Sequence, residues 1–276
     1  MEYICPTIGC IMATIMFAAP VQDLRKAIER GSLGSLNPFP WVAMTGNCLG
    51  WCAYGYYKSD PFVLGGNLPA FVLSIWLNSG AAKLQFLQKW IQHKEQLQLQ
   101  QQQITTTTTT TTTADLVTVP QERNLLIFLF LWAVVLVYVE WFPQLLLFTS
   151  DPSVIIGVLV NFNLVFFYGA PLEAIQRVVS SGKSDAIHLP TQIMTCTNTT
   201  FWALYGFAKH DPVIYIPNVM GLLLGIVQGL LRCIYPATQQ QQQQQQQHTI
   251  LNGEDEDDDD GNDGEEENIH AHSLLT

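Results

Sequence analysis

The sequence is poor in charge. Asp, Glu, Lys and Arg make up 13% of its 276 residues, against roughly 25% in an average soluble domain. Hydrophobic residues make up 48% of the chain. So few charges do not suffice to cover a soluble globule of this length. We therefore exclude an ordinary soluble domain, and we expect no nucleic-acid partner.

The acidity of the chain belongs to one short segment. The formal net charge is −11, but 11 of the 23 acidic residues lie between Glu254 and Glu267, and the remaining 12 balance 12 Lys and Arg. A block of like charges is normally solvated and disordered. The body of the protein is therefore close to neutral.

The usual signatures of enzyme chemistry are also missing. The sequence shows no nucleotide-binding loop, metal cluster or paired carboxylates, and its cysteines have neither zinc-binding nor disulfide spacing. We interpret the cysteines as small buried hydrophobic residues. We therefore expect no enzyme, no catalytic residue, no metal and no cofactor.

Long uncharged runs dominate what is present. A helix that crosses a bilayer core about 30 Å thick needs about 20 residues. Six runs contain no Asp, Glu, Lys or Arg: 3–22, 31–57, 61–82, 152–172, 186–208 and 212–231. A seventh run, 124–139, is shorter and continues past Glu140 to residue 148. These runs predict an all-α integral membrane protein with seven transmembrane helices.

Lys and Arg are unevenly divided between the short loops. With the N-terminus outside, the outer loops receive only Lys58 and Lys209, and the inner side receives ten such residues. Cytoplasmic loops carry the excess of Lys and Arg, so we place the N-terminus outside and the C-terminus in the cytosol. The ten inner residues are Arg25, Lys26, Arg30, Lys83, Lys89, Lys94, Arg123, Arg177, Lys183 and Arg232.

One stretch occurs twice, 151 residues apart: WCAYGYYKSDPFVLGGN at 51–67 and WALYGFAKHDPVIYIPN at 202–218. Eight positions match without a gap. They are Asn47, Trp51, Tyr54, Gly55, Lys58, Asp60, Pro61 and Asn67, with counterparts Asn198, Trp202, Tyr205, Gly206, Lys209, Asp211, Pro212 and Asn218. Three predicted helices in each half are joined by the fourth, so both halves run in the same direction.

Four prolines belong to the same duplication. Pro20 matches Pro171 at the offset of 151, and Pro40 matches Pro190 at 150. We predict that the first pair ends the first and fifth helices and that the second pair begins the second and sixth, all at the cytoplasmic end. Because proline loosens or kinks a helix, these positions are either hinges of an inner gate or ordinary helix ends.

Together, the four prolines, the W..YG stretch in both halves and the 3+1+3 order resemble the SWEET sugar transporters over about residues 5 to 235. The resemblance implies two parallel three-helix repeats joined by a linker helix, and a gating role for the prolines. The expected boundaries are 1–83 and 151–235 for the repeats and 124–150 for the linker helix. Between and after them we expect a low-complexity cytoplasmic loop at 84–123 and a disordered Gln-rich and acidic tail at 236–276.

The repeated Trp and Asn residues are the predicted substrate site. At 1.5 Å per residue, Trp51 and Asn67 lie about 10 Å inward from the outer turn, and Trp202 and Asn218 do the same in the second half. Asn supplies both donors and acceptors for sugar hydroxyls, and indole stacks on the apolar face of a sugar ring. The resemblance also implies substrate contact at these positions. The alternatives are an Asn that bonds a neighbouring helix and a Trp at the membrane interface.

Asn47 and Asn198 stand one helical turn before the two Trp residues and share a face with them. We therefore include them in the predicted site, as residues that line the pore or support it.

The charged residues near the outer side are ambiguous. Lys58, Asp60, Lys209 and Asp211 form either a solvated rim or an external gate of Lys/Asp pairs. We interpret Glu140 as interfacial, because it lies near the outer end of its run and has no counterpart in the repeats. A proton relay is the alternative for an acid in a membrane helix.

We expect passive, bidirectional transport of a small neutral sugar by alternating access. Two Trp residues suggest a narrow site and favour a monosaccharide. The alternatives are a cargo or sorting receptor of the PQ-loop type and an amino-acid transporter. The expected partners are the sugar, the lipid bilayer and, as an open option, further copies of the chain. The plasma membrane is the expected location, with a Golgi or endosomal membrane as the alternative.

Overall fold

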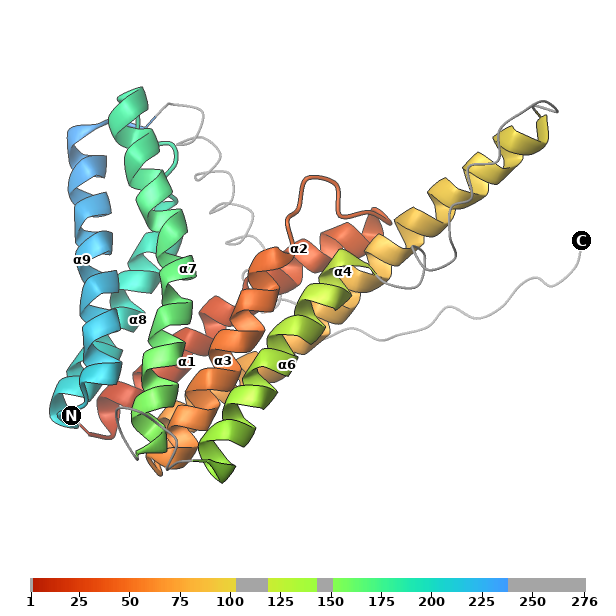
Figure 1. The fold of residues 1–276 in the computed structure, drawn as a ribbon. Helices are drawn as coiled ribbons and strands as arrows, with labels where there is room; N and C mark the ends of the chain where they lie inside the picture. Colours follow the sequence, from red (N-terminus) through yellow and green to blue (C-terminus); the bar gives the residue numbers. More distant parts are fainter. Residues whose placement is uncertain (1, 103–118, 143–150, 238–276) are drawn as a thin grey trace, which may run out of the picture.

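The computed structural model describes residues 2–102, 119–142 and 151–237, and the regular elements in these ranges are all helices (Figure 1). Their bounds are α1 (Ile4–Ala18), α2 (Pro20–Glu29), α3 (Phe39–Tyr57), α4 (Pro61–Gln102), α6 (Pro120–Trp141), α7 (Pro152–Ser181), α8 (Leu189–Ala208) and α9 (Pro212–Ile234). The kinked pair α1 and α2 forms the first of the seven long helical segments, as predicted.

The helices form two three-helix repeats with the same internal order. In the first repeat α4 contacts both α1 and α3, and in the second α9 contacts both α7 and α8. Between the repeats, α1 packs against α8 and α7 packs against α3. This reciprocal pairing is what two copies related by a rotation axis produce, and it confirms the predicted pair of parallel repeats. The linker helix α6 packs mainly against α3 and α4, on the first repeat.

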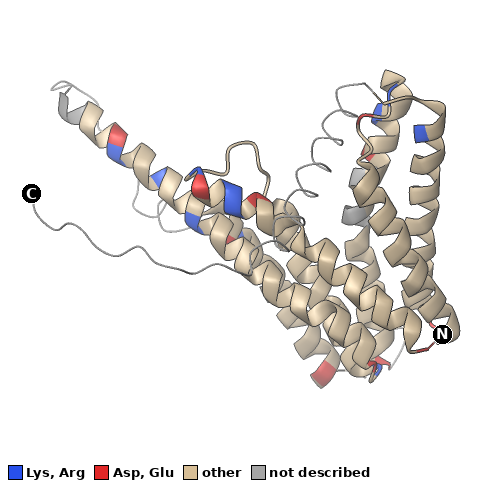
Figure 2. Cartoon of the chain, turned by 180° about the vertical axis from the view of Figure 1, so that it is seen from behind, with Lys and Arg blue, Asp and Glu red and all other residues tan. Residues whose placement is uncertain are grey.

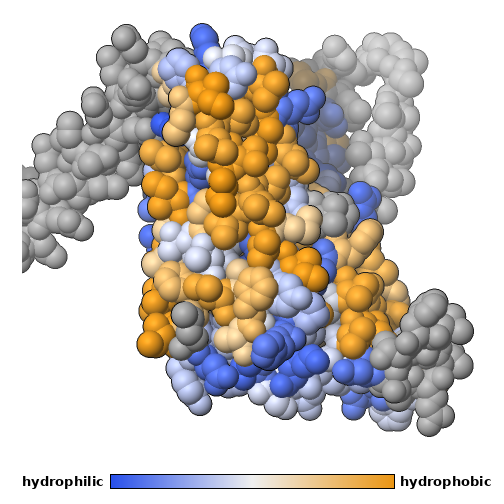
Figure 3. All heavy atoms as spheres, turned by 90° about the vertical axis from the view of Figure 1, so that its left-hand side faces the viewer, coloured by the Kyte–Doolittle hydropathy of each residue, from blue (hydrophilic) through white to orange (hydrophobic). Residues whose placement is uncertain are grey.

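The surface of the bundle suits a membrane. Among the described residues, four segments are long and apolar enough to cross one: 4–29, 61–99, 120–141 and 212–234. The outward faces of α6 and α9 expose large hydrophobic side chains such as Phe130 and Leu223, and Figure 3 shows a hydrophobic band on the α9 side of the molecule. Helix α3 is instead largely buried among its neighbours, so it does not need a fully apolar surface.

Charged residues gather toward the two ends of the helices, and the middle stretches are almost free of them (Figure 2). We call the end with the tight α3–α4 and α8–α9 turns the turn end. We call the opposite end, where α2 and most Lys and Arg residues lie, the basic end. The two repeats lie close together at the turn end and diverge toward the basic end (Figure 1).

The two tight turns explain several of the duplicated residues. A side chain on Gly55 would place its Cβ 2.9 Å from the backbone nitrogen of Leu64, and one on Gly206 would lie 2.7 Å from that of Tyr215. Glycine therefore lets the two helices of each hairpin approach closely. Ser59 follows with a left-handed φ of 52°, which reverses the chain before α4.

The prolines shape the helices differently from the prediction. Pro20 was expected to end a helix, and α1 does end at Ala18, but Ala19 keeps a helical conformation and a second helix, α2, starts at Pro20 itself. Pro171 lies inside α7, which continues to Ser181. Because the N–H of the first helical residue has no partner within its own helix, proline is tolerated at the start of α2, whereas α7 continues through Pro171. Pro40 is the second residue of α3, as predicted, and Pro190 has the same position in α8.

The helix boundaries also differ from the predicted domain boundaries. The loop expected at 84–123 is helical to Gln102, and α6 already begins at Pro120. Leu, Gln and Lys are good helix formers, so the low-complexity segment continues α4. The Thr tract at 105–113, the end of the linker helix at 143–150 and the acidic tail lie outside the described residues.

Candidate functional site

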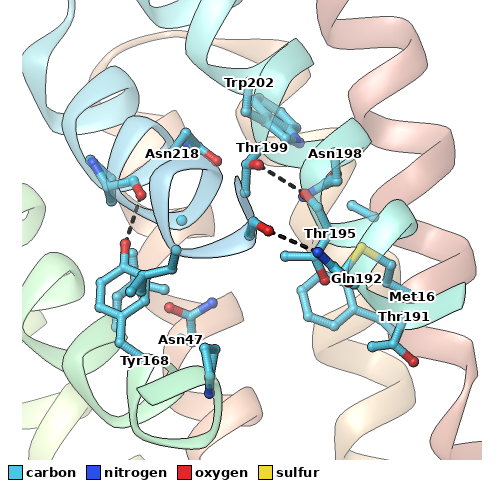
Figure 4. A pocket seen from close by; sticks show the side chains of 18 of the residues that line it. Met16, Asn47, Tyr168, Thr191, Gln192, Thr195, Asn198, Thr199, Trp202 and Asn218 are labelled. Carbon is cyan, nitrogen blue, oxygen red and sulfur yellow. Dashed lines mark hydrogen bonds between the residues drawn. The ribbon is translucent and has the colours of Figure 1, made fainter. Parts of the chain in front are cut away.

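A cavity of about 420 Å³ lies between the two repeats. This volume falls within the range of about 300–1,000 Å³ that is usual for small-molecule sites. All six predicted substrate residues line it, and Figure 4 shows part of this lining. They are Trp51, Asn67 and Asn47 from the first repeat and Trp202, Asn218 and Asn198 from the second. The structure thus brings the predicted set together, and their contact with a substrate remains a prediction.

The two Trp residues are held in matching ways. Each is 8% exposed, and each packs edge-to-face on the Tyr one turn later: Trp51 on Tyr54 at 5.7 Å between ring centroids, and Trp202 on Tyr205 at 5.9 Å. Such pairs add about 0.5–1.5 kcal/mol beyond the buried area. The indoles are therefore positioned before any ligand arrives.

The side chain of Trp202 also reaches across to the other repeat. A Cβ atom on Gly9 of α1 would lie 2.9 Å from the indole nitrogen, and one on Gly66 of α4 would lie 3.0 Å from the indole ring. Trp202 therefore occupies a space that only glycine at these two positions leaves open.

The Asn residues leave hydrogen-bonding capacity at the cavity. Asn67 Nδ2 donates to Val63 O at 2.9 Å, and Asn218 Nδ2 donates to Ile214 O at 2.7 Å. These bonds fix the carboxamides on their own helices, and each group keeps an oxygen and a second N–H outside that bond.

The other Asn pair is incompletely satisfied. Asn47 Oδ1 and Asn198 Oδ1 are buried without a hydrogen-bond partner among the described residues. An unsatisfied buried acceptor costs about 1–3 kcal/mol. The same cost at matched positions of both repeats is unusual for a purely structural helix contact, and a ligand hydroxyl would relieve it.

The lining carries no formal charge apart from a His at its rim. Within the described part of the chain, no Asp, Glu, Lys or Arg contributes to it, and His188 lies at the basic end. Tyr168, Gln192 and Thr195 add further neutral polar groups. The cavity can therefore bind a neutral polar molecule, but it offers no counter-ion to a carboxylate or an ammonium group.

Two hydrogen bonds between the repeats lie on the turn side of the Trp pair. Tyr54 OH donates to Asp211 Oδ2, and Tyr205 OH donates to Asp60 Oδ2, both at 2.6 Å. The other oxygen of each carboxylate caps the helix that follows: Asp60 Oδ1 accepts from the backbone of Val63, and Asp211 Oδ1 caps α9 in the same way. We call these two reciprocal bonds the Tyr–Asp latch.

Sequence reasoning missed the latch. The sequence also left open that Lys and Asp pair at this end, and the structure does not show such pairs. Asp60 and Asp211 accept hydrogen bonds from tyrosines instead. Lys209 lies over the ring of Tyr205, 5.9 Å from its centroid. The repeated Tyr was visible in the duplicated stretch. Its partner was not, because it belongs to the other repeat.

Glu140 also has a specific partner. Tyr57 OH donates to Glu140 Oε2 at 2.6 Å, which joins the turn ends of α3 and the linker helix α6. This bond supports the interpretation of Glu140 as interfacial, because it lies away from the cavity lining.

Of the four predicted gate prolines, only Pro171 lines the cavity. Its carbonyl accepts a hydrogen bond from Gln228 Nε2 of α9 at 3.2 Å. Pro20 lies at the α1–α2 kink. The gating role of the prolines remains a prediction.

Comparison with known proteins places this architecture in a family. Residues 4–77 and 154–240, more than half of the chain, match a family model described as "Sugar efflux transporter for intercellular exchange". The chain belongs to this SWEET family. The two matched segments correspond to the two repeats and leave the linker helix between them.

The SWEET relatives align over nearly the whole described region. "Bidirectional sugar transporter SWEET5" of Arabidopsis thaliana is 25% identical over 84% of this chain and 85% of its own length. "Sugar transporter SWEET1" of Rattus norvegicus is 26% identical over 84% of this chain and 90% of its own length. The solved structure of a eukaryotic SWEET transporter superimposes with a TM-score of 0.64 at 19% identity, covering 84% of this chain and 95% of that one. This last likeness supports the fold.

Proposed function

We propose that this SWEET protein carries a neutral monosaccharide passively, in either direction, across a membrane. The observation that carries the proposal is the cavity of about 420 Å³ between the repeats, which combines two positioned indoles with four asparagine carboxamides and a lining free of Asp, Glu, Lys and Arg in the described chain. Indole faces stack on the C–H face of a sugar ring, and carboxamides exchange hydrogen bonds with its hydroxyls.

The two ends of the cavity differ in how closely the repeats approach each other, and this difference supports alternating access. The Tyr–Asp latch holds the repeats together at the turn end. The cavity lining continues from Trp202 to His188 and Gln228 at the basic end, where the repeats diverge (Figure 1). The structure therefore resembles a carrier that is closed at the turn end. We propose that the latch opens when the repeats rock about the cavity and close at the basic end.

An amino-acid transporter and a sorting receptor both explain the residues that line the cavity less well than a sugar transporter does. An amino acid would need partners for its carboxylate and its ammonium group, and the described lining offers neither. A sorting receptor has no need of a cavity between its repeats that is lined by indoles and carboxamides. The family match is to sugar transporters, and it does not favour either alternative.

Uptake of labelled glucose by yeast that lacks its hexose carriers tests the proposal. We expect flux above that of empty cells at confirmed surface expression, with no dependence on an imposed pH gradient. Asn218→Ala should abolish flux at normal expression, because it removes the hydrogen bonds that this carboxamide of the cavity lining can make to a sugar. Flux equal to that of empty cells would refute the transporter, and normal flux in the variant would move the binding site elsewhere.

We further propose that the basic end faces the cytosol, with the N-terminus outside, in the plasma membrane. The unequal division of Lys and Arg supports this orientation. Labelling of epitope tags at the two termini in intact and permeabilised cells tests it, and cross-linking in the same membranes tests for a homo-oligomer. A C-terminal tag that is accessible in intact cells would reverse the assignment.

A further inference from the structure

The second repeat carries a polar stripe that the sugar site described above does not use. Gln192, Thr195 and Thr199 of α8 line the cavity between Trp202 and the basic end (Figure 4). They precede Trp202 by ten, seven and three residues, a spacing that keeps them on one helical face. At 1.5 Å per residue, Thr195 and Gln192 lie roughly 10–15 Å along the helix from the indole. A single sugar ring stacked on Trp202 would not reach them.

The first repeat has no such stripe. In the register of the duplicated Asn and Trp residues, the counterparts of the three polar residues are Trp41, Met44 and Cys48. All three are at most 5% exposed and belong to a hydrophobic core within the first repeat. The same positions are therefore core in one half and cavity wall in the other.

The kink at Pro20 explains part of this difference. It turns α2 onto α4, where Leu24 is fully buried and joins the core of the first repeat. This packing covers the basic half of the first repeat. In the second repeat, the corresponding face of α8 borders the cavity, so polar side chains there contact whatever passes through it.

The stripe has unused hydrogen-bonding capacity. Gln192 Nε2 donates to Gly225 O at 2.8 Å, while Gln192 Oε1 is buried without a partner in the described chain. Thr199 Oγ1 donates to Thr195 O at 2.8 Å, which leaves the oxygen of that hydroxyl as an acceptor. No hydrogen bond of the Thr195 hydroxyl occurs among the described residues.

We propose that Gln192, Thr195 and Thr199 form a second sugar-binding subsite, which holds the hydroxyls of a monosaccharide between the central site and the basic end. The subsite rests on the proposed function, because its ligand is the transported sugar. It is accessible from the basic end in the conformation described here. It gives a departing or arriving sugar a hydrogen-bonded position on the second repeat, and the first repeat offers an apolar surface instead.

Sided transport kinetics test the subsite. Glucose influx from the bath and efflux of injected glucose are measured separately in oocytes that express the full chain, with the basic end facing the cytosol. Thr195→Val keeps the shape of the side chain and removes the hydroxyl. One net hydrogen bond contributes about 1 kcal/mol, so we expect the half-saturation concentration for efflux to rise about fivefold. The value for influx should change less than twofold.

Thr197→Val is the matched control. Thr197 lies two residues along α8, outside the cavity lining, and its hydroxyl donates to Ile193 O. This variant should leave both half-saturation values unchanged. Gln192→Leu provides a second test, with an expected rise in the efflux value of the same sign.

The outcomes separate the two proposals. Absence of flux in the wild-type chain at confirmed surface expression overturns the proposed function, and the subsite with it. Normal wild-type flux with an unchanged efflux half-saturation in Thr195→Val overturns the subsite alone. An equal rise in both directions also overturns it, because that result indicates damage to the central site or to the fold.

Discussion

The Tyr–Asp latch should determine which end of the carrier is open. Tyr54→Phe removes one phenolic hydroxyl and leaves the ring that packs on Trp51. A hydrogen bond to a charged group contributes about 1.5–3 kcal/mol, so its loss should shift the equilibrium away from the latched state by about tenfold to a hundredfold. Tyr205→Phe should have the same effect, because the second bond has the same length and reciprocal geometry.

Distances between spin labels measure this shift. Tyr56 at the end of α3 and Phe207 at the end of α8 are 71% and 51% exposed, so both can carry a label in a variant without the native cysteines. We expect a second, longer distance at the turn end in Tyr54→Phe. Double replacement of both tyrosines should make the longer distance predominant, because the two bonds act on the same motion.

Tyr57→Phe is the matched control for the latch. It also removes a bond of 2.6 Å between a tyrosine and a carboxylate, but that bond joins α3 to the linker helix and not to the second repeat. Its distance distribution should equal that of the wild type. Equal distributions in Tyr54→Phe and the wild type, or an equal shift in the control, would refute the assignment of the latch.

Three further substitutions test how the helices and the indole are positioned. Gly206→Ala should lower the melting temperature, because its Cβ would lie 2.7 Å from the backbone of Tyr215 and strain of this kind costs about 1–3 kcal/mol. Asn78→Leu should also lower it, since the two N–H groups of the fully buried Asn78 side chain are shared among three buried oxygens and its own oxygen accepts from Gln121 Nε2, and a buried polar group that loses its partner costs about 1–3 kcal/mol. Gly66→Ala should raise the half-saturation concentration for glucose, because its Cβ would displace Trp202.

Gly65→Ala controls for both glycine variants. A Cβ at Gly65 meets no atom within 4 Å, so alanine should leave the melting temperature unchanged or raise it slightly, in line with its higher helix propensity. A melting temperature of Gly206→Ala equal to that of this control would contradict the close hairpin packing. An unchanged half-saturation in Gly66→Ala would contradict the positioning of Trp202 from the first repeat.

Much of the fold could be predicted from the sequence, because the two repeats still share matching residues at a fixed offset. The uncharged runs indicate the membrane helices, and the matched Trp and Asn residues point to one shared cavity, which the structure shows. The Tyr–Asp pairing was not predictable from one chain read in order. Tyr54 lies six residues from Asp60, yet it bonds Asp211, and this choice depends on how the repeats are placed against each other.

Residues without a counterpart in the other repeat were the harder ones to find. A search for matched positions selects what the two halves share, and it passes over Thr195, whose counterpart is Met44. The spacing of the polar stripe on α8 was a visible signal, but periodic polar residues on a helix do not reveal whether they face a cavity. In the first repeat the kink at Pro20 places α2 over the equivalent face, so that face is buried and does not border the cavity.

The two halves diverge toward the basic end, and this divergence has a mechanical consequence. In the first repeat Thr45 bonds Ser74, and Asn78 links both to Gln121 of the linker helix. In the second repeat the counterparts of Thr45, Ser74 and Asn78 are a cysteine and two glycines. Buried polar networks fix one arrangement of helices, while at these positions of the second repeat the described side chains make the single bond from Gln192 Nε2 to Gly225 O. The first repeat and linker helix should therefore move as one rigid unit, and adjustment at the basic end should fall mainly on the second repeat.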